Sequence, residues 1–320
     1  MSREYRPGMV HLNDAQKEAL HEKISAGINA GRIIITLDFD DTMFINTRDP
    51  KTNHVEELEV NNYLVQFLAE LLSAHGAQHF EFHILSSRPP DEDYKLKWPD
   101  LSISLIYRDG KSNLQLFLDE LNKQLLILCN EIKIPPGNEI KIPPENIHCL
   151  GGKGCVWFFD VNNKNIFLDI DIRPTREILT GNTASREPSL FRTAFENDVR
   201  IRMRELQDAY PDKEIAAQIE ERCPKYVYLM QLFEKLNPRS HFCVAIDDNQ
   251  VELNGFKILQ NILAILVQPQ LKQPVLSRHN SSPNLDLEQE VSNKEAELAA
   301  KMHAKNHLED LEFPTPTSTL

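Results

Sequence analysis

Residues 32–42 read RIIITLDFDDT and join an apolar run to a cluster of acids. The run from Arg32 to Phe39 is short and continuous, which is typical of a strand buried on both faces of a parallel sheet. Carboxylates as close as Asp38, Asp40 and Asp41 repel one another, so this stretch points to a bound cation or a reaction. If the chain stays extended, alternation predicts that Asp38 and Asp40 point to the same side.

Similar apolar runs recur along the chain and alternate with helical stretches. Further strands are predicted at Phe80–Ser86, Asn146–Leu150, Phe242–Ile246 and Leu263–Val267, and helices at Asn13–Ala30, Val60–Ala74, Asn113–Ile132 and Glu214–Leu236. Asn13 and Gln16 have the spacing of a capping box. The alternation predicts an α/β fold, a Rossmann-like parallel sheet flanked by helices. Such sheets bind their ligands at the carboxyl ends of the strands.

The sequence divides into an N-terminal helix (1–31), a core (32–269) and a tail (270–320). Residues 151–210 interrupt the core with a predicted hairpin, Val156–Ile172, and a charged helix near Ser189–Tyr210. We interpret this insertion as a cap or subdomain. Between Thr42 and Val60 there is room for a short flap. The tail is polar and charged and is predicted to be partly disordered.

Charge and composition exclude several classes of protein. The chain has 320 residues, and its net charge of -13 argues against binding to nucleic acid or to an anionic membrane. Its five cysteines include no C-x-x-C pair, which favours reduced thiols over disulfides or a zinc site. It shows no signal peptide and no apolar run of membrane-spanning length, so we expect a cytoplasmic protein without membrane insertion.

Three other places carry chemically useful side chains at strand or helix ends. The strand at Phe80–Ser86 ends in Ser86, Ser87 and Arg88; Lys225 precedes a strand by one helix; and Asp247 and Asp248 follow that strand. Each has a simpler explanation alone, because serines often end strands, lysines are usually solvated and aspartates cap helices. Together with residues 38–42 they form one ordered set at the strand exits and helix starts of one α/β pattern.

This set resembles the haloacid dehalogenase superfamily of phosphohydrolases. In that family a D-x-D-x-T motif follows the first strand, a Ser or Thr ends the next, a Lys opens a helix and an acidic pair closes a further strand. The matching residues here are Asp38, Asp40, Thr42, Ser86, Lys225, Asp247 and Asp248. Ser87 stands where glycine is more common, whereas Arg88 matches a frequent basic residue.

The resemblance implies a Mg²⁺-dependent phosphatase. Asp38 would be the nucleophile that becomes an aspartyl phosphate, and Asp40 the general acid and base. The Mg²⁺ ligands would be Asp38, the Asp40 backbone carbonyl, and Asp247 or Asp248.

The same resemblance implies a set of side chains that bind the phosphate. Thr42, Ser86, Ser87 and Lys225 would contact the phosphoryl oxygens of the substrate and offset their charge. The long insertion falls where this family places one of its kinds of cap, which would set the substrate if it covered the site.

Several alternatives remain at this level. The same scaffold could carry a dehalogenase, a phosphomutase or a nucleic-acid end phosphatase, although Asp40 favours phosphoryl chemistry over dehalogenation. A non-catalytic interaction protein is the alternative from another class. The acidic tail loosely resembles the translocation signals of bacterial type IV secreted effectors, which would imply secretion into a host cell. The phosphorylated substrate would be a small molecule, a phospholipid or a phosphoprotein. Asp169, Asp171 and Arg173 either serve substrate binding from the cap or form an exposed strand face.

Overall fold

The structure, a computed structural model, describes residues 8–48, 55–94, 98–132, 139–163, 167–174, 190–236, 242–257, 259 and 262–268. The chain separates into two compact units. The first contains the described residues of Met1–Gly151, Pro224–Lys257 and Asn261–Ser282, and the second contains those of Gly152–Cys223. The tail at 270–320, with its proposed export signal, lies outside the described residues.

A mostly parallel sheet of six strands forms the centre of the first unit, in the order β1-β11-β10-β2-β5-β6. Five strands are parallel, and β1 pairs antiparallel with β11 at one edge. The strands are β1 (Val10–His11), β2 (Ile33–Leu37), β5 (Phe80–Ser86), β6 (Ile147–Cys149), β10 (Phe242–Asp247) and β11 (Ile262–Val267). The predicted α/β fold with a parallel sheet flanked by helices is confirmed.

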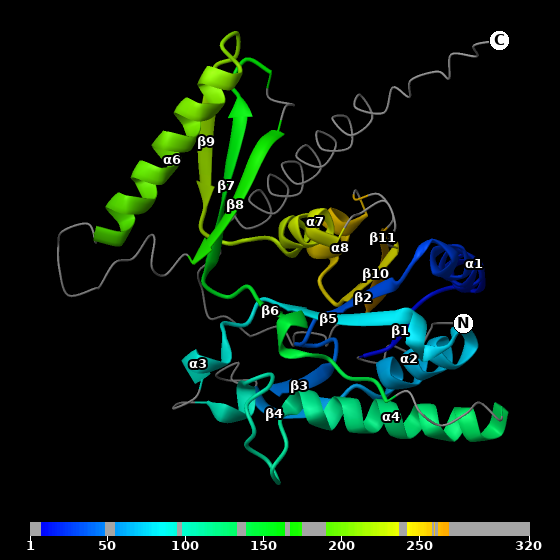
Figure 1. The fold of residues 1–320 in the computed structure, drawn as a ribbon. Coiled ribbons are helices and arrows are strands. Elements are labelled where there is room, and N and C mark those ends of the chain that lie inside the picture. The colour runs from blue at the N-terminus through cyan, green and yellow to red at the C-terminus, as the bar shows by residue number, and fades with distance from the viewer. Residues whose placement is uncertain are drawn as a thin grey trace, which may run out of the picture. The chain divides into compact units, whose positions relative to one another are not determined.

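Helices on both faces explain why the central strands are apolar throughout. All five residues of β2 are buried. Helices α2 (Asn62–His75) and α4 (Asn113–Ile132) lie on one face, and α7 (Lys225–Leu236) and α8 (Gln250–Phe256) on the other (Figure 1). Helix α1 (Asp14–Ala30) begins with the predicted capping box and contributes to the same core as α2 and α4.

The order of the strands creates a topological switch point in the sheet. From β2 the chain proceeds to β5 and β6 on one side and returns to β10 and β11 on the other. Open α/β sheets bind ligands at such a switch point, outside the carboxyl ends of the strands. Here it lies between β2 and β10, where the Asp38 N–H donates to the Ile246 carbonyl over 3.0 Å.

The region between the first acids and α2 contains an antiparallel hairpin that was not predicted. It consists of β3 (Phe44–Arg48) and β4 (Val55–Val60) and fills the space expected for a flap. Other short elements also escaped prediction, as expected for segments too brief to show a period. They are β1, η1 (Ala77–His79), α3 (Asp91–Tyr94), η2 (Pro99–Leu101), η3 (Pro144–Asn146) and α8.

The second unit is a three-stranded antiparallel sheet with one helix. Strands β7 (Lys153–Asp160), β8 (Phe167–Pro174) and β9 (Ile215–Glu220) run in the order β8-β7-β9, and β7 and β8 form the predicted hairpin. Helix α6 (Leu190–Ala209) packs on one face of this sheet (Figure 1). Their shared core consists of Val156, Phe158, Phe195, Val199, Leu206 and Ile215.

The helix predicted over Glu214–Leu236 is wrong in its first half. Residues Ile215–Glu220 form β9, which pairs with β7 along its whole length, and α7 begins only at Lys225. The Ala, Gln and Glu residues of β9 favour a helix locally, but the ladder with β7 overrides that preference. Pro224 precedes α7, where a helix tolerates proline, and it was the available signal for this boundary.

Two expectations drawn from composition can be compared with the structure. Within the described part of the chain, no helix is long and apolar enough to cross a membrane. Among the described cysteine side chains, Cys149, Cys155, Cys223 and Cys243 are not in disulfide bonds. The Cys129 side chain lies outside the described residues.

Candidate active site

A buried lysine joins two aspartates at the carboxyl edge of the central sheet. Lys225, the first residue of α7, places its Nζ 2.8 Å from Asp38 Oδ1 and 2.8 Å from Asp247 Oδ2. The side chains of Lys225, Asp38 and Asp247 are 4%, 7% and 2% exposed, respectively. Asp38 directly follows β2, and Asp247 ends the adjacent strand β10. The fold thus places two carboxylates and a cation side by side at its switch point.

Neighbouring groups hold Lys225 and Asp247 in these positions. The Lys225 backbone N–H donates to Glu252 Oε2 of α8 over 3.0 Å, which satisfies one of the free N–H groups at the start of α7. Helix α8 approaches closely at Gly255, where a Cβ would come within 2.5 Å of the Tyr226 ring. The Asp247 Oδ1 accepts from the Asn249 N–H over 2.8 Å. The cluster is therefore supported from its backbone as well as through its charges.

The site holds more negative charge than its lysine neutralises. Burial raises the pKa of Asp38 to about 7, with repulsion from Asp247 and Asp40 adding to burial and Lys225 opposing it. Burial likewise raises the pKa of Asp247 to about 6 and of Asp248 to about 7. Burial lowers the pKa of Lys225, but Asp247, Asp38 and Glu252 outweigh it and raise that pKa above its usual range. Without a further cation, these carboxyl groups tend to keep protons at neutral pH.

Three of these acids could hold a metal ion. One carboxylate oxygen each from Asp38, Asp247 and Asp248 lies within 4.8 Å of the others. Their donor atoms are all oxygens, which suits Mg²⁺, an ion that usually keeps several waters besides one or two carboxylates. Their raised pKa values show that a second positive charge in this cluster would stabilise the ionised carboxylates. The residues fit the metal that the sequence predicted.

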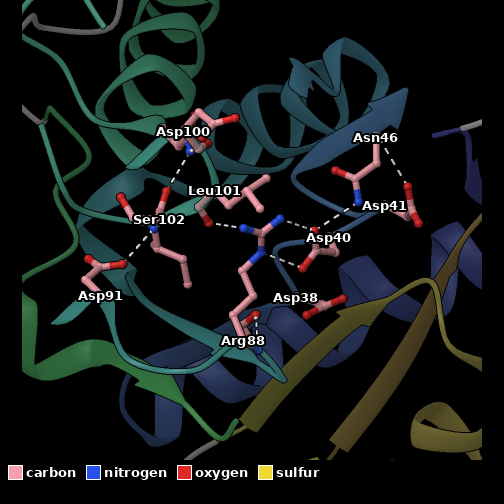
Figure 2. Close-up of polar contacts among 12 residues, drawn as sticks. Asp38, Asp40, Asp41, Asn46, Arg88, Asp91, Asp100, Leu101 and Ser102 are labelled. Carbon is pink, nitrogen blue, oxygen red and sulfur yellow. Dashed lines mark hydrogen bonds and ion pairs between the residues drawn. The ribbon is translucent and has the colours of Figure 1, made fainter. Parts of the chain in front are cut away.

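Asp40 has partners of its own. Strand β2 ends at Leu37, and the chain then turns, with Asp41 in the left-handed region at a φ of 54°. Asp40 accepts hydrogen bonds of 2.6 and 2.5 Å from the Arg88 guanidinium and one of 2.9 Å from Asn46 Nδ2 (Figure 2). Because the strand does not continue past Leu37, strand alternation does not govern Asp40. Asp38 and Asp40 are instead oriented by different partners, Lys225 and Arg88.

The hydroxyl groups predicted to bind phosphate are in different situations. Thr42 is fully buried, its carbonyl accepts from Asn61 Nδ2 over 2.8 Å, and its Oγ1 has no hydrogen-bond partner among the described residues. Ser86 is buried at the end of β5, and its Oγ accepts from the Arg88 N–H over 3.2 Å. Ser87 is exposed. Thr42 and Ser86 thus remain better placed than Ser87 for a role at this edge of the sheet.

The structure adds residues whose roles the sequence did not reveal. Arg88 had been noted only as a basic residue after Ser87, and its ion pair with Asp40 was not predicted. Asn46 and Glu252 had no recognisable signal, because an amide on a hairpin and an acid in a helix are common surface features. No protein-family model matches the chain, and no curated protein or solved structure matches it either.

Proposed function

We propose that this chain is a Mg²⁺-dependent phosphatase of the haloacid dehalogenase type that hydrolyses a phosphomonoester. The observation that carries the proposal is the buried contact of Lys225 with Asp38 and Asp247, with Asp248 completing a cluster of three acids. Phosphoryl transfer needs a nucleophile in line with phosphorus and positive charge on the phosphoryl oxygens. In this proposal the first unit is the catalytic core and the second unit its cap.

Asp38 is the proposed nucleophile. Its carboxylate attacks phosphorus, the bond from phosphorus to the ester oxygen breaks, and an aspartyl phosphate forms. Asp40 donates a proton to the departing oxygen and then accepts one from the water that hydrolyses the intermediate. Phosphate leaves, and Asp38 returns to its starting state. Lys225 favours the ionised, reactive form of Asp38, which burial alone disfavours.

The remaining residues bind and neutralise the phosphoryl group. Asp38, Asp247 and Asp248 would hold the ion, and Mg²⁺ when bound supplies the positive charge that the three acids and the phosphoryl oxygens require. Lys225 would share its ammonium group with one phosphoryl oxygen. The buried Thr42 hydroxyl lacks a partner among the described residues, which supports a role in binding a polar group of the substrate.

The test is hydrolysis of p-nitrophenyl phosphate by the wild type and by Asp38→Asn, with Mg²⁺ and with chelator. We expect metal-dependent turnover that falls by about 10³-fold or more in the variant, since the nucleophile is lost. Asp171→Asn is the matched control, because it removes an Arg-paired aspartate from the second unit. Turnover that survives in a folded Asp38→Asn protein would contradict the proposal.

Absence of turnover in the wild type has two explanations that one measurement separates. Beryllium fluoride mimics an aspartyl phosphate and should bind the wild type in the presence of Mg²⁺, but not Asp38→Asn. Binding without turnover would mean that the aryl phosphate cannot reach a competent site. Failure of both turnover and binding would overturn the proposed function.

A further inference from the structure

Arg88 is a buried arginine with every part of its side chain engaged. The residue is 7% exposed, although it follows the exposed Ser87. Its guanidinium carbon lies 4.7 Å from the centroid of the Phe39 ring, and its Nη1 donates to the Leu101 carbonyl. Its Nε and Nη2 donate to the two carboxylate oxygens of Asp40. These donors are therefore already used by the protein and are not directed at a substrate phosphate.

The backbone of Arg88 is fixed by contacts that do not involve Asp40. Its N–H donates to the Ser86 hydroxyl, and its carbonyl accepts from the Gly151 N–H over 2.9 Å. Gly151 lies so close that a Cβ there would come within 2.5 Å of the Arg88 carbonyl carbon. The adjacent strands β5 and β6 thus hold this backbone tightly.

The carbonyl that accepts from Arg88 is also held in place. Asn113, the first residue of α4, donates its Nδ2 to the carbonyls of Asp100 (2.8 Å) and Ser102 (2.6 Å), on either side of Leu101. Asp91 accepts hydrogen bonds from the backbone N–H groups of the two residues after Ser102. Figure 2 shows Arg88 between this loop and Asp40. The loop therefore offers Arg88 a rigid second anchor.

Asp40 is held much less firmly by its own surroundings. It lies in a turn after β2, and its side chain is 32% exposed. Two hydrogen bonds from Arg88 engage both oxygens of its carboxylate, and one from Asn46 engages Oδ1. A planar guanidinium fork fixes the plane of a carboxylate as well as its distance. We therefore expect the firmly held Arg88 to orient Asp40, and not the reverse.

We propose that Arg88 is the positioning residue that orients Asp40 for proton transfer to the leaving oxygen. This inference rests on the proposed phosphatase function and deepens it. It assigns Arg88 no contact with the phosphoryl group. Its consequence is a dependence on the leaving group: substrates whose alcohol needs a proton to depart rely on Arg88, whereas substrates with a stable phenolate do not.

The experiment compares Arg88→Met and Arg88→Lys with the wild type on p-nitrophenyl phosphate and on a simple alkyl phosphate. For Arg88→Met we expect a fall in kcat of about 100-fold on the alkyl phosphate and less than about 10-fold on the aryl phosphate, the scale of general acid catalysis. Arg88→Lys keeps the charge but not the fork, and should fall between. If Arg88→Met fails to fold, as judged by thermal unfolding, Arg88→Lys carries the test.

A double variant separates positioning from direct action. If Arg88 acts through Asp40, adding Arg88→Met to Asp40→Asn should reduce alkyl phosphate turnover by less than about 3-fold further, because residues that act as a unit are not additive. Arg173→Met is the matched control: Arg173 also pairs with an aspartate, Asp171, and lies 5.4 Å from a phenylalanine ring, that of Phe195. The Arg173→Met substitution should change kcat for the alkyl phosphate and for the aryl phosphate by the same factor.

Several results would overturn the inference. Equal losses on both substrates with a raised KM would show that Arg88 binds the phosphate itself. Fully additive effects of Arg88→Met and Asp40→Asn would show that the two act independently. Either result, with turnover that Asp38→Asn abolishes, leaves the phosphatase function standing. A wild type that neither hydrolyses a phosphomonoester nor binds beryllium fluoride would overturn both proposals together.

Discussion

Two groups of aspartates that share one basic side chain have the same residue types but differ in burial. In the first unit Asp38 and Asp247 share Lys225, and each of these side chains is at most 7% exposed. In the second unit Asp171 and Asp198 share Arg173, and these side chains are 36% to 54% exposed. Asp38, Asp247 and Asp171 look alike in the sequence, as aspartates within or directly after a strand, whereas Asp198 lies in helix α6. Removal from water is what distinguishes a reactive cluster from a charged surface.

The difference has energetic consequences. Ion pairs exposed to solvent contribute at most about 1 kcal/mol, because water competes for both charges. A buried charge that loses its partner destabilises a protein by about 3–5 kcal/mol. The first group accordingly carries raised carboxyl pKa values, while the second is well explained as an exposed strand face. The effects of substitutions on the free energy of unfolding should therefore differ in size between the two groups, and in one case in sign.

The largest difference should follow from removing the two bases. Lys225→Met should lower the free energy of unfolding by about 3 kcal/mol at pH 8 without metal, because it leaves buried acids without their cation. Arg173→Met should lower it by less than about 1 kcal/mol. Urea denaturation monitored by circular dichroism measures both. Similar losses of unfolding free energy in the two variants would contradict the proposed difference between the buried and the exposed group.

The pH dependence of stability should show the buried acids directly. An acid whose pKa is raised by folding stabilises the protein fully below its unfolded pKa and loses that contribution as pH rises through its folded pKa. With folded pKa values of about 6 to about 7, the metal-free protein should lose at least about 2 kcal/mol of stability between pH 4 and pH 7 from this cluster. Lys225 stays charged across this range and adds no slope.

A variant isolates that slope from the rest of the molecule. The pKa values of Asp119 and Glu120 are lowered by their hydrogen bonds. Their contribution to the stability of the protein therefore increases as pH rises through the acidic range. The difference between the wild type and Asp247→Asn removes such contributions. Saturating Mg²⁺ should flatten the wild-type slope, because the ion replaces protons in the cluster. A wild-type slope unchanged in Asp247→Asn would contradict the assignment.

A smaller effect, opposite in sign, should come from Asp248. Burial and the neighbouring Asp38 and Asp41 raise its pKa to about 7, so its ionised form is disfavoured in the folded protein. Asp248→Asn should therefore stabilise the metal-free protein by about 1 kcal/mol at pH 8 while weakening the response to Mg²⁺. Thermal unfolding with and without Mg²⁺ measures both. Destabilisation without metal would argue against net repulsion in the cluster.

The smallest effect is expected in the second unit. Asp171→Asn removes a half-exposed partner of Arg173 and should change the free energy of unfolding by no more than about 0.5 kcal/mol. Its kcat for p-nitrophenyl phosphate should equal that of the wild type. A large loss of activity there would instead support the alternative that this strand binds substrate.

Much of the first unit could be predicted because its signals are local. The short apolar run before Asp38 is typical of a buried strand, and the same holds for the runs before Ser86 and Asp247. Parallel strands bring their carboxyl ends to one edge, so the fold class placed Asp38 and Asp247 at the same edge, while the structure showed that their strands are neighbours. The second unit was harder, because β9 is a strand through its pairing with β7 and not through its own residues.

The sequence by itself determined the fold class and the strands that end in acids, because the apolar character and the periodicity of these segments are local properties of the sequence. Only the tertiary structure decided that Asp40 pairs with Arg88, that Glu252 supports Lys225 and that residues 215–220 form a strand. Those contacts join elements distant along the chain. Their free energy depends on distance, angle and exclusion of water, which no local pattern of residues specifies.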